Sequence, residues 1–359
     1  MTKMIKLSLA AAVAVAGFTT SAAAADLSNT TFSGKVEFEY DYTKNDDTEA
    51  TTNQYDIDVD VKAKTKLSDT WTSIVVAQAD TAGDVDNGQS PDVNGNSTVA
   101  SADGKNLSRV NIAVAMFQYS NGSTTLKIGR QGGLNATPYF DDERGDGFVA
   151  THTFGSVTLA AAHVENINNG TVGDEAVNAA AIIGSFGPVN ASLWAAEVGE
   201  LDSQSLNVNG KFGIVSAALT HTELDTGAAD SSNSLTKLVV SAPVGPVTLT
   251  AGYGTTDSKG GTVAFNNDAS AAFTLDNVSL NGQKDADAIL VAVSGKIGAV
   301  TASLSYLDAD LENDGDADET LVKVAYPLAK ALKVTASYSD YSVNDVDQAA
   351  ASVALEYKF

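Results

Sequence analysis

The sequence predicts an all-β fold, a transmembrane antiparallel β-barrel of about eighteen strands, with sixteen as the alternative. Three observations predict it. Apolar and polar side chains alternate along many segments, short turns alternate with longer polar loops, and no apolar run of about 18 residues follows the amino-terminal region. A membrane helix needs about 20 consecutive apolar residues, whereas a tilted barrel strand crosses in about 9–11. The membrane is therefore expected to be crossed by strands.

The amino-terminal segment has the organisation of a secretory signal peptide. Basic Lys3 and Lys6 precede an apolar stretch at 7–18 and a run of small residues. The apolar stretch is too short for a spanning helix, and this order of features directs export. We therefore expect a signal peptide at 1–25 and a single outer-membrane barrel domain at 26–359.

Two segments near the amino terminus show the alternation most clearly. In the first, Glu37 and Glu39 alternate with aromatic Phe38 and Tyr40. In the second, one face carries Tyr55, Ile57, Val59, Val61 and Ala63, and the other carries Asp56, Asp58, Asp60, Lys62 and Lys64. Successive strand residues point to opposite faces of a sheet, and burying an unpaired charge in a dry core costs several kcal/mol. A water-filled lumen removes that cost. We therefore expect these charges to line the lumen: Glu37, Glu39, Asp56, Asp58, Asp60, Lys62 and Lys64.

Connections of two lengths divide the chain. Short turns are predicted at 67–70, 120–123, 155–156, 187–188, near 213, at 245–246, near 298 and at 330–331. Longer polar loops are predicted near 43–53, 81–106, 131–147, 166–175, 199–204, 225–233, 257–286, 309–319 and 342–347. Eight turns and nine loops separate eighteen strands, and in outer-membrane barrels the short turns face the periplasm.

The chain ends on an alternating segment closed by Tyr357 and Phe359. A terminal phenylalanine after alternating apolar residues resembles the signal read by the barrel-insertion machinery. The alternative is that Phe359 is simply the aromatic end of a final strand.

The third long loop carries a cluster of charges. The loop contributes Asp141, Asp142, Glu143, Arg144 and Asp146, and the only other arginines are Arg109 and Arg130. By similarity to general porins, we expect this long third loop to fold into the lumen, with its four acids facing Arg109, Lys127 and Arg130. Opposed charges across a narrow pore create a transverse field that selects solutes. The alternative is a solvated acidic loop.

The direction of two arginines follows from alternation. Arg109 is expected to point inward, since Val110, Ile112, Val114 and Met116 share the outward positions. Arg130 instead shares its parity with the outward Leu126 and Ile128.

Short blocks of the sequence resemble the major outer membrane protein family of Campylobacter and its relatives. The blocks are 129–131, 134–135, 146–147, 156–162, 6–10 and 354–359. The resemblance implies an eighteen-stranded, trimeric, cation-selective porin, with calcium at an acidic constriction as an open alternative. The chain departs from the family in being shorter, in having Arg130 where lysine is expected, and in lacking a loop tryptophan.

Composition limits the partners. The net charge of −24 disfavours nucleic acid, whose phosphates need basic residues, and carboxylates lining a pore concentrate cations. We expect small cations and solutes, outer-membrane lipid and lipopolysaccharide and the barrel-assembly machinery as partners, and the resemblance implies a homotrimer. No cofactor is expected. Calcium at the acidic loops is the alternative, because residues 310–318 have the spacing of a calcium loop, although its twelfth position is Leu321 rather than glutamate.

Two other functions stay open. A barrel hydrolase would need a nucleophile and an oriented base, and the histidines His152, His163 and His221 fall in no catalytic motif that we identify. A surface structural or adhesive β-protein would use the long polar loops at 81–106 and 257–286. The sequence favours a non-enzymatic cation-preferring channel of the cell outer membrane.

Overall fold

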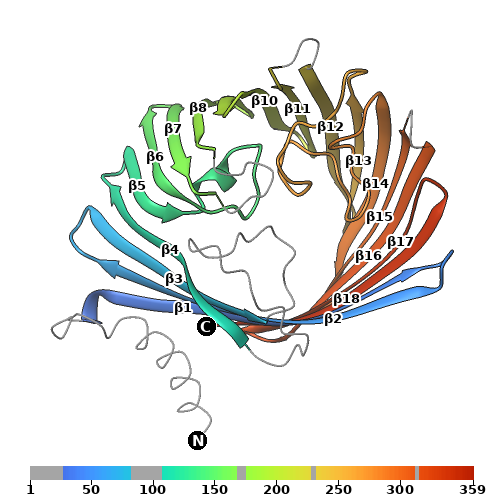
Figure 1. Ribbon diagram of the computed structural model, residues 1–359, viewed down its shortest axis with the longest axis horizontal. Helices are drawn as coiled ribbons and strands as arrows, with labels where there is room; N and C mark the ends of the chain where they lie inside the picture. Colours follow the sequence, from blue (N-terminus) through green and yellow to red (C-terminus); the bar gives the residue numbers. More distant parts are fainter. Residues whose placement is uncertain (1–26, 82–106, 168–174, 228–231, 312–314) are drawn as a thin grey trace, which may run out of the picture.

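In the computed structural model the chain forms one closed barrel of eighteen antiparallel strands (Figure 1). The structure describes residues 27–81, 107–167, 175–227, 232–311 and 315–359. The predicted signal peptide and most of the predicted loop at 81–106 lie outside these ranges. Within them, no helix is long and apolar enough to cross a membrane.

The elements follow one another along the chain as a continuous meander. They are η1 (Leu27–Asn29), β1 (Thr30–Asn45), β2 (Ala50–Lys66), β3 (Trp71–Thr81), β4 (Leu107–Ser120), β5 (Thr124–Gln131), η2 (Gly133–Ala136), β6 (Gly145–Phe154), β7 (Val157–Glu165), β8 (Val177–Phe186), β9 (Val189–Val198), β10 (Leu201–Phe212), β11 (Val215–Asp225), β12 (Ser232–Val244), β13 (Val247–Thr256), β14 (Ala286–Ile297), β15 (Val300–Leu311), β16 (Gly315–Ala329), β17 (Leu332–Val343) and β18 (Val346–Lys358).

The barrel closes because β1 pairs with both β2 and β18. Strands β2 to β17 each pair with their two neighbours in the chain, and β18 pairs with β17 and β1. Closure leaves no unpaired sheet edge, which a hydrocarbon environment demands. The predicted all-β antiparallel barrel and the count of eighteen strands are confirmed.

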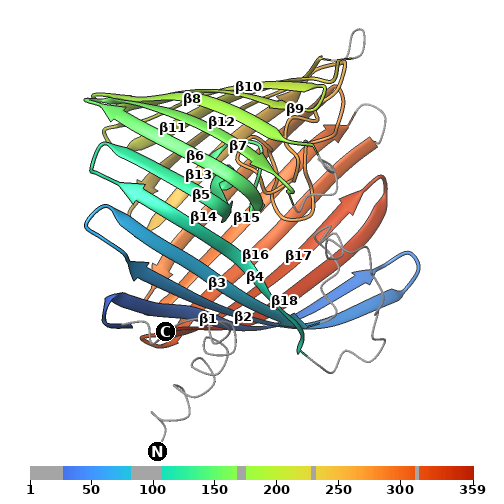
Figure 2. The same ribbon diagram turned by 60° about the vertical axis from the view of Figure 1, so that its left-hand side comes forward.

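The predicted short turns lie at one end of the barrel (Figure 2). The predicted contrast with longer loops at the other end is confirmed only in part, because the connections at 199–200 and 344–345 are equally short. Four loops are less than half as long as predicted, those at 43–53, 199–204, 309–319 and 342–347. The strands continue through their polar residues; the β1–β2 ladder, for example, reaches Asn45 opposite Ala50. Backbone pairing does not depend on apolar side chains, so the ladders extend beyond the apolar part of each strand.

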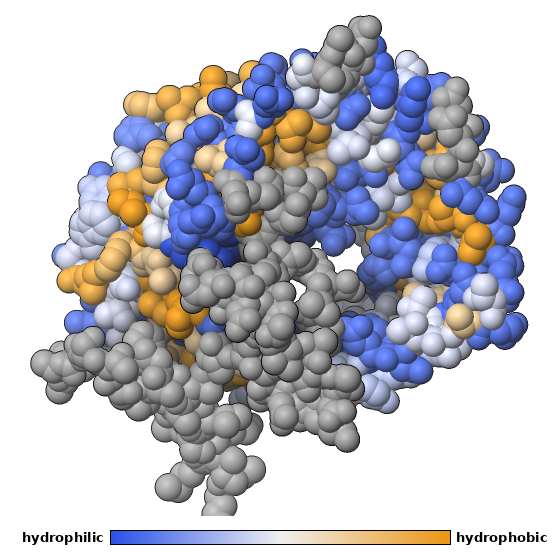
Figure 3. Space-filling view, in the orientation of Figure 1, coloured by the Kyte–Doolittle hydropathy of each residue, from blue (hydrophilic) through white to orange (hydrophobic). Residues whose placement is uncertain are grey.

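Apolar side chains face outward on alternate positions. Phe38 is 42% exposed and Tyr55 62% exposed on neighbouring strands, and their rings lie 6.1 Å apart between centroids. The space-filling view shows hydrophobic patches at the outer edge, most clearly on the side of β5–β8, and hydrophilic residues bordering an opening on the side of β14–β17 (Figure 3). The outer face is therefore suited to lipid and the inner face to water.

A bulge in the β3–β4 ladder changes the alternation in β4. The register shifts between Val76 and Ala77, and beyond the shift Phe117 is 53% exposed and lies opposite outward Ile128. The prediction that Val114 and Met116 share the outward face of Ile112 is therefore wrong. One extra residue in a bulge moves all later side chains to the other face.

Candidate functional site

Loop 3, residues 132–144 between β5 and β6, folds into the barrel (Figure 1). Its aromatic side chains Tyr139 and Phe140 are buried. They pack against inward side chains of the wall, which are Val164, Val177, Ala179, Ala196 and Val198. The Tyr139 hydroxyl also donates to the carbonyl of Trp194 at 3.5 Å, and burial raises the pKa of Tyr139 to about 12. The prediction that the long third loop folds into the lumen is confirmed.

Loop 7, residues 257–285 between β13 and β14, folds inward as well. It is not the external polar loop that the sequence predicted. Its buried residues, among them Ala271, Phe273 and Leu280, pack against inward Leu235 and Leu307. The signal was present in the sequence, since alanine, valine, leucine and phenylalanine recur through 263–280. Burial of these side chains stabilises the inward fold.

The two loops hold each other inside the lumen. The rings of Phe140 and Phe265 stack with centroids 4.7 Å apart. Beside them the Asp141 amide donates to the side-chain oxygen of Asn266 at 3.1 Å, and the Asn266 amide group donates back to the Asp141 carbonyl at 2.7 Å. The Phe265 amide donates to the Tyr139 carbonyl at 2.9 Å. Loops 3 and 7 therefore form one bridge inside the barrel, which we call the loop bridge.

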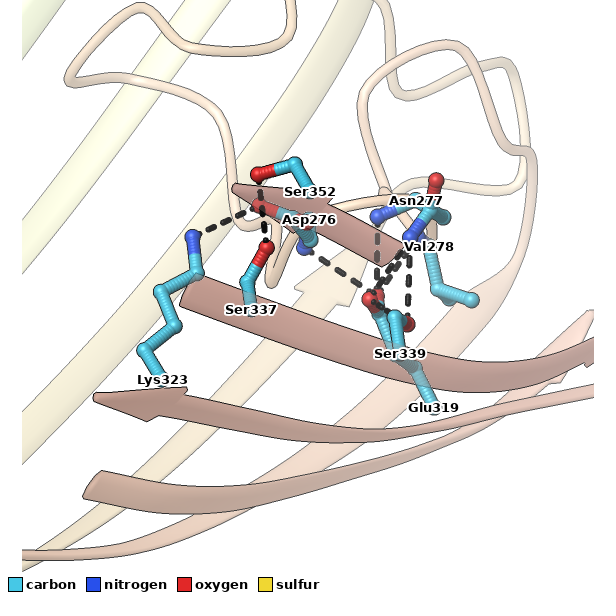
Figure 4. A network of polar contacts seen from close by, with 8 residues as sticks. All are labelled: Asp276, Asn277, Val278, Glu319, Lys323, Ser337, Ser339 and Ser352. Atoms are coloured by element: carbon cyan, nitrogen blue, oxygen red, sulfur yellow. Dashed lines mark hydrogen bonds and ion pairs between the residues drawn. The ribbon is translucent and has the colours of Figure 1, made fainter. Parts of the chain in front are cut away.

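Glu319 anchors loop 7 to the wall (Figure 4). This carboxylate on β16 is fully buried. It accepts hydrogen bonds at 2.9–3.0 Å from the backbone amides of Asp276, Asn277 and Val278 and one from the Ser339 hydroxyl at 2.6 Å. Charge-assisted hydrogen bonds of this kind are about twice as strong as neutral ones. The anchor makes loop 7 a fixed part of the lumen.

Three carboxylates gather where the two loops meet. Asp141 and Asp142 come from loop 3, and Asp268 comes from loop 7. Partial burial, followed by the negative charges of Asp142 and Asp268, raises the pKa of Asp141. Sequence reasoning identified the first two acids but missed Asp268, because 127 residues separate it from Asp141.

The wall that faces loop 3 is formed by β1, β2 and β3. The Arg144 guanidinium donates to the side-chain oxygen of Gln78 at 2.9 Å, and Arg144, Asp142 and Lys35 act electrostatically on Asp60. Glu143 is mostly buried within the loop. The predicted group of Asp141, Asp142, Glu143 and Arg144 is thus brought together in the lumen.

The predicted constriction is wrong for one basic residue, Arg130, and for one acid, Asp146. Arg130 and Asp146 bond to each other, with 3.5 Å between Nη1 and Oδ2. They share the outward alternation of Ile128 and Phe148, so neither faces the loop acids. Lys127 is on the inward face opposite Gln118, and among the described residues no contact joins it to those acids. Arg109 pairs in register with Asp80, and its side chain lies outside the described residues.

The predicted lumen charges occupy the inward face of β1 and β2. Glu37 lies opposite Asp58, Glu39 opposite Asp56, and Lys35 opposite Asp60. Farther along β2, Lys62 and Lys64 lie toward the short-turn end. Charge is therefore concentrated on one wall, with its acids beside the loop bridge.

The described residues of the predicted calcium loop lie on two paired strands, and residues 312–314 lie outside the described ranges. Asp308 lies opposite Asp318, and Asp310 opposite Asp316, on two strands of a hairpin. Within the part of the chain that the structure describes, no group of three or more histidine and acidic side chains could hold a metal ion. Calcium binding stays a prediction.

Comparison with known proteins agrees with this architecture. A family model described as Gram-negative porin matches residues 10–273. No curated protein matches the chain. Among solved structures, OccAB4 of Acinetobacter baumannii is 13% identical with a TM-score of 0.72. OpdK of Pseudomonas aeruginosa with vanillate is 13% identical with a TM-score of 0.73, and OccK2 (OpdF) of the same organism with glucuronate is 14% identical with a TM-score of 0.74. Each alignment covers 92% of this chain and 98% of the other. At such identities the likeness establishes the fold.

Proposed function

Because the chain belongs to the Gram-negative porin family and lies in the outer membrane, we propose that it is a water-filled, cation-preferring diffusion channel for ions and small hydrophilic solutes. The observation that carries the proposal is the acidity of the loop bridge. Asp141, Asp142 and Asp268 interact electrostatically at the junction of the two loops. Carboxylates in a narrow lumen raise the local cation concentration and repel anions, and low-dielectric walls focus that field.

The charges of the facing wall support the same preference. Its acids include Asp60, which is within electrostatic reach of the loop bridge. The basic groups beside it are Lys35, which pairs with Glu37 at 3.5 Å, and Arg144. Acidic side chains therefore outnumber basic side chains around the constriction. The transverse electric field points from the basic groups to the acidic groups.

Carboxylate solutes fit this lumen poorly. The structurally similar OpdK and OccK2 hold vanillate and glucuronate, both of which carry a carboxylate. In this chain such a group would meet Asp141, Asp142 and Asp268 at the constriction. We expect cations and uncharged solutes to pass faster than anions of the same size.

Ion selectivity tests the proposal directly. In a planar bilayer with a salt gradient, the reversal potential of the wild-type channel should favour K⁺ over Cl⁻. The triple variant Asp141→Asn, Asp142→Asn, Asp268→Asn should move the reversal potential toward zero, because the channel then distinguishes K⁺ from Cl⁻ less well. A matched control, Asp308→Asn with Asp318→Asn, removes two acids from the outward face and should leave the potential unchanged. An anion-favouring wild type, or equal shifts in both variants, would overturn the proposal.

Other properties remain proposals that follow from the resemblance and the export signal. These are the signal peptide at 1–25, the Campylobacter-type relationship, the homotrimer, contact with lipopolysaccharide, and possession of an assembly signal. The last is supported by the geometry of the final strand, where the rings of Tyr357 and Phe359 stack with centroids 6.0 Å apart. Detergent-extracted protein should migrate as a trimer before heating and as a monomer after it.

We propose no catalytic role. His221 lies between a hydroxyl and a carboxylate, as the base of a catalytic triad does. Its Nδ1 is 2.7 Å from the Thr236 hydroxyl, and its Nε2 is 3.1 Å from a Glu223 carboxylate oxygen. These three residues lie on paired strands whose backbone amides are used in the ladder, so no pair of amides is left there for an oxyanion. An adhesive role for 257–286 is also disfavoured, because that loop is folded inside the barrel.

A further inference from the structure

A ladder of side-chain amides lines the inner wall across from the charged strands. Asn190 lies on β9, and Asn207 and Asn209 lie on β10. The Ser185 hydroxyl donates to Asn190 at 2.7 Å, and the Asn190 amide donates to Asn209 at 3.2 Å. The Asn209 amide donates to Asn207 at 2.8 Å. Asn207 in turn donates to the Thr220 hydroxyl at 2.7 Å. These four bonds form one continuous chain, which we call the amide ladder.

Each asparagine of the amide ladder keeps hydrogen-bonding capacity. A primary amide has two N–H donors and a carbonyl oxygen with two lone pairs. In the ladder each amide spends one donor and one lone pair on its neighbours. One donor and one acceptor site therefore remain on every rung, and the side chains stay partly exposed on the lumen side. The rungs are also fixed in orientation, because each holds the next.

A groove opens at the short-turn end of the ladder. Its volume is about 330 Å³, and the side chains that line it include Asn190, Asn209, Lys211, Ser216 and Ser241. This volume is within the range of small-molecule sites, about 300–1,000 Å³. Amides, hydroxyls and one ammonium group provide its polar contacts.

The wall around the ladder is free of acids where the structure describes it. Along the inward positions of β9, β10 and β11 the polar side chains are serine, threonine and asparagine, with Lys211 at the short-turn end. The acids of the lumen wall lie instead on β1 and β2, with Glu319 on β16 and Glu356 on β18. A cation gains little electrostatic attraction along this neutral wall. A group that both donates and accepts hydrogen bonds can bond to each asparagine of the amide ladder in turn.

We propose that the amide ladder is a path for uncharged polyhydroxylated solutes, meaning sugars and sugar alcohols. A hydroxyl is one donor and an acceptor, which matches the free sites of each rung. Such a solute loses hydrogen bonds to water when it enters a narrow lumen, and the rungs replace them one after another. The inference rests on the proposed channel function and adds a substrate class to it.

Solute uptake into proteoliposomes tests the path. The probes are an uncharged hexose and an oligoethylene glycol of equal hydrodynamic size, which has few hydroxyls. The wild type should pass the hexose faster. The variant Asn207→Leu with Asn209→Leu keeps the number and branching of the side-chain heavy atoms and removes the polar groups. Hexose uptake should fall about fivefold while glycol uptake is unchanged. The control Thr248→Val with Thr250→Val changes inward residues of β13 outside the groove and should match the wild type.

Two results would overturn the inference. Equal passage of both probes through the wild type is one, and unchanged hexose uptake in the leucine variant is the other. If the double variant does not form barrels, the single variant Asn209→Leu gives the same comparison. The K⁺/Cl⁻ reversal potential of the same preparations reports the channel function separately. A cation-selective channel that does not distinguish the probes would refute the ladder alone.

Discussion

Phe359 closes the barrel on Gly34. The Gly34 amide donates to the Phe359 carbonyl at 2.9 Å, and the Phe359 amide donates back to the Gly34 carbonyl at 3.0 Å. The Phe359 ring occupies the space where a side chain at Gly34 would begin. An aromatic ring laid over a strand glycine fills the gap left by the missing side chain. The last residue of the chain thus contributes both to the backbone ladder and to the outer surface.

The first prediction concerns this closure. A Cβ at position 34 would collide with the Phe359 ring and with the carbonyl oxygen of Asp60. Gly34→Ala should therefore lower the free energy of unfolding by about 1–3 kcal/mol, the usual cost of overpacking. Urea unfolding of detergent-folded protein measures it. The neighbouring change Ser33→Ala is the control, and equal stability of the two variants would show that the contact does not matter.

The second prediction concerns the anchor of loop 7. Glu319→Gln keeps the shape of the side chain but replaces one acceptor oxygen with a donor facing the amides of 276–278. Hydrogen bonds to a charged group contribute about 1.5–3 kcal/mol, so loop 7 should open and become sensitive to protease within 257–285. The control Lys323→Gln removes only the partly exposed ion pair with Asp276, which is expected to contribute less than about 1 kcal/mol. Protection equal to the wild type in the Glu319 variant would contradict the role of the anchor.

The third prediction separates two arginines. Arg144 bonds Gln78 on the lumen wall, whereas Arg130 bonds Asp146 on the outward face. Arg144→Gln should increase the K⁺ over Cl⁻ preference, because a positive charge leaves the constriction. Arg130→Gln should leave the reversal potential unchanged. The reverse result in bilayer recordings would restore the original assignment of Arg130 to the constriction.

The fourth prediction concerns acid. Burial and the charges of Asp142 and Asp268 raise the pKa of Asp141 above its ordinary value of 3.8. At a pH above this raised pKa the Asp141 carboxylate is charged. As the pH falls, Asp141 takes up its proton at a higher pH than a free aspartate does. The cation preference of the channel should therefore decrease as the pH falls through the raised pKa of Asp141. Because the folded state binds this proton more readily than the unfolded state, proton uptake also stabilises the folded state. Reversal potentials measured from neutral to acidic pH test this, and Asp141→Asn should remove the first step of the decrease.

The sequence alone determined the strands, their number and, apart from the part of β4 beyond its bulge, their inner and outer faces. These properties depend on a two-residue alternation and on local turn residues, as in the row Asp56, Asp58 and Asp60 beside Tyr55 and Ile57. Lipid on one side and water on the other require that alternation directly. The length of the polar loops was less well determined, since paired backbones continue through polar residues such as Asn45.

Only the tertiary structure decided how the two loops and the wall meet inside the barrel. Asp268 meets Asp141, and Arg144 reaches Gln78, through contacts between segments that are far apart in the chain. A single β-bulge between Val76 and Ala77 changed the facing of later side chains in β4. The physical reason is that alternation is a property of neighbours in sequence, whereas a constriction is built by packing and hydrogen bonds between loops that meet only after the barrel has closed.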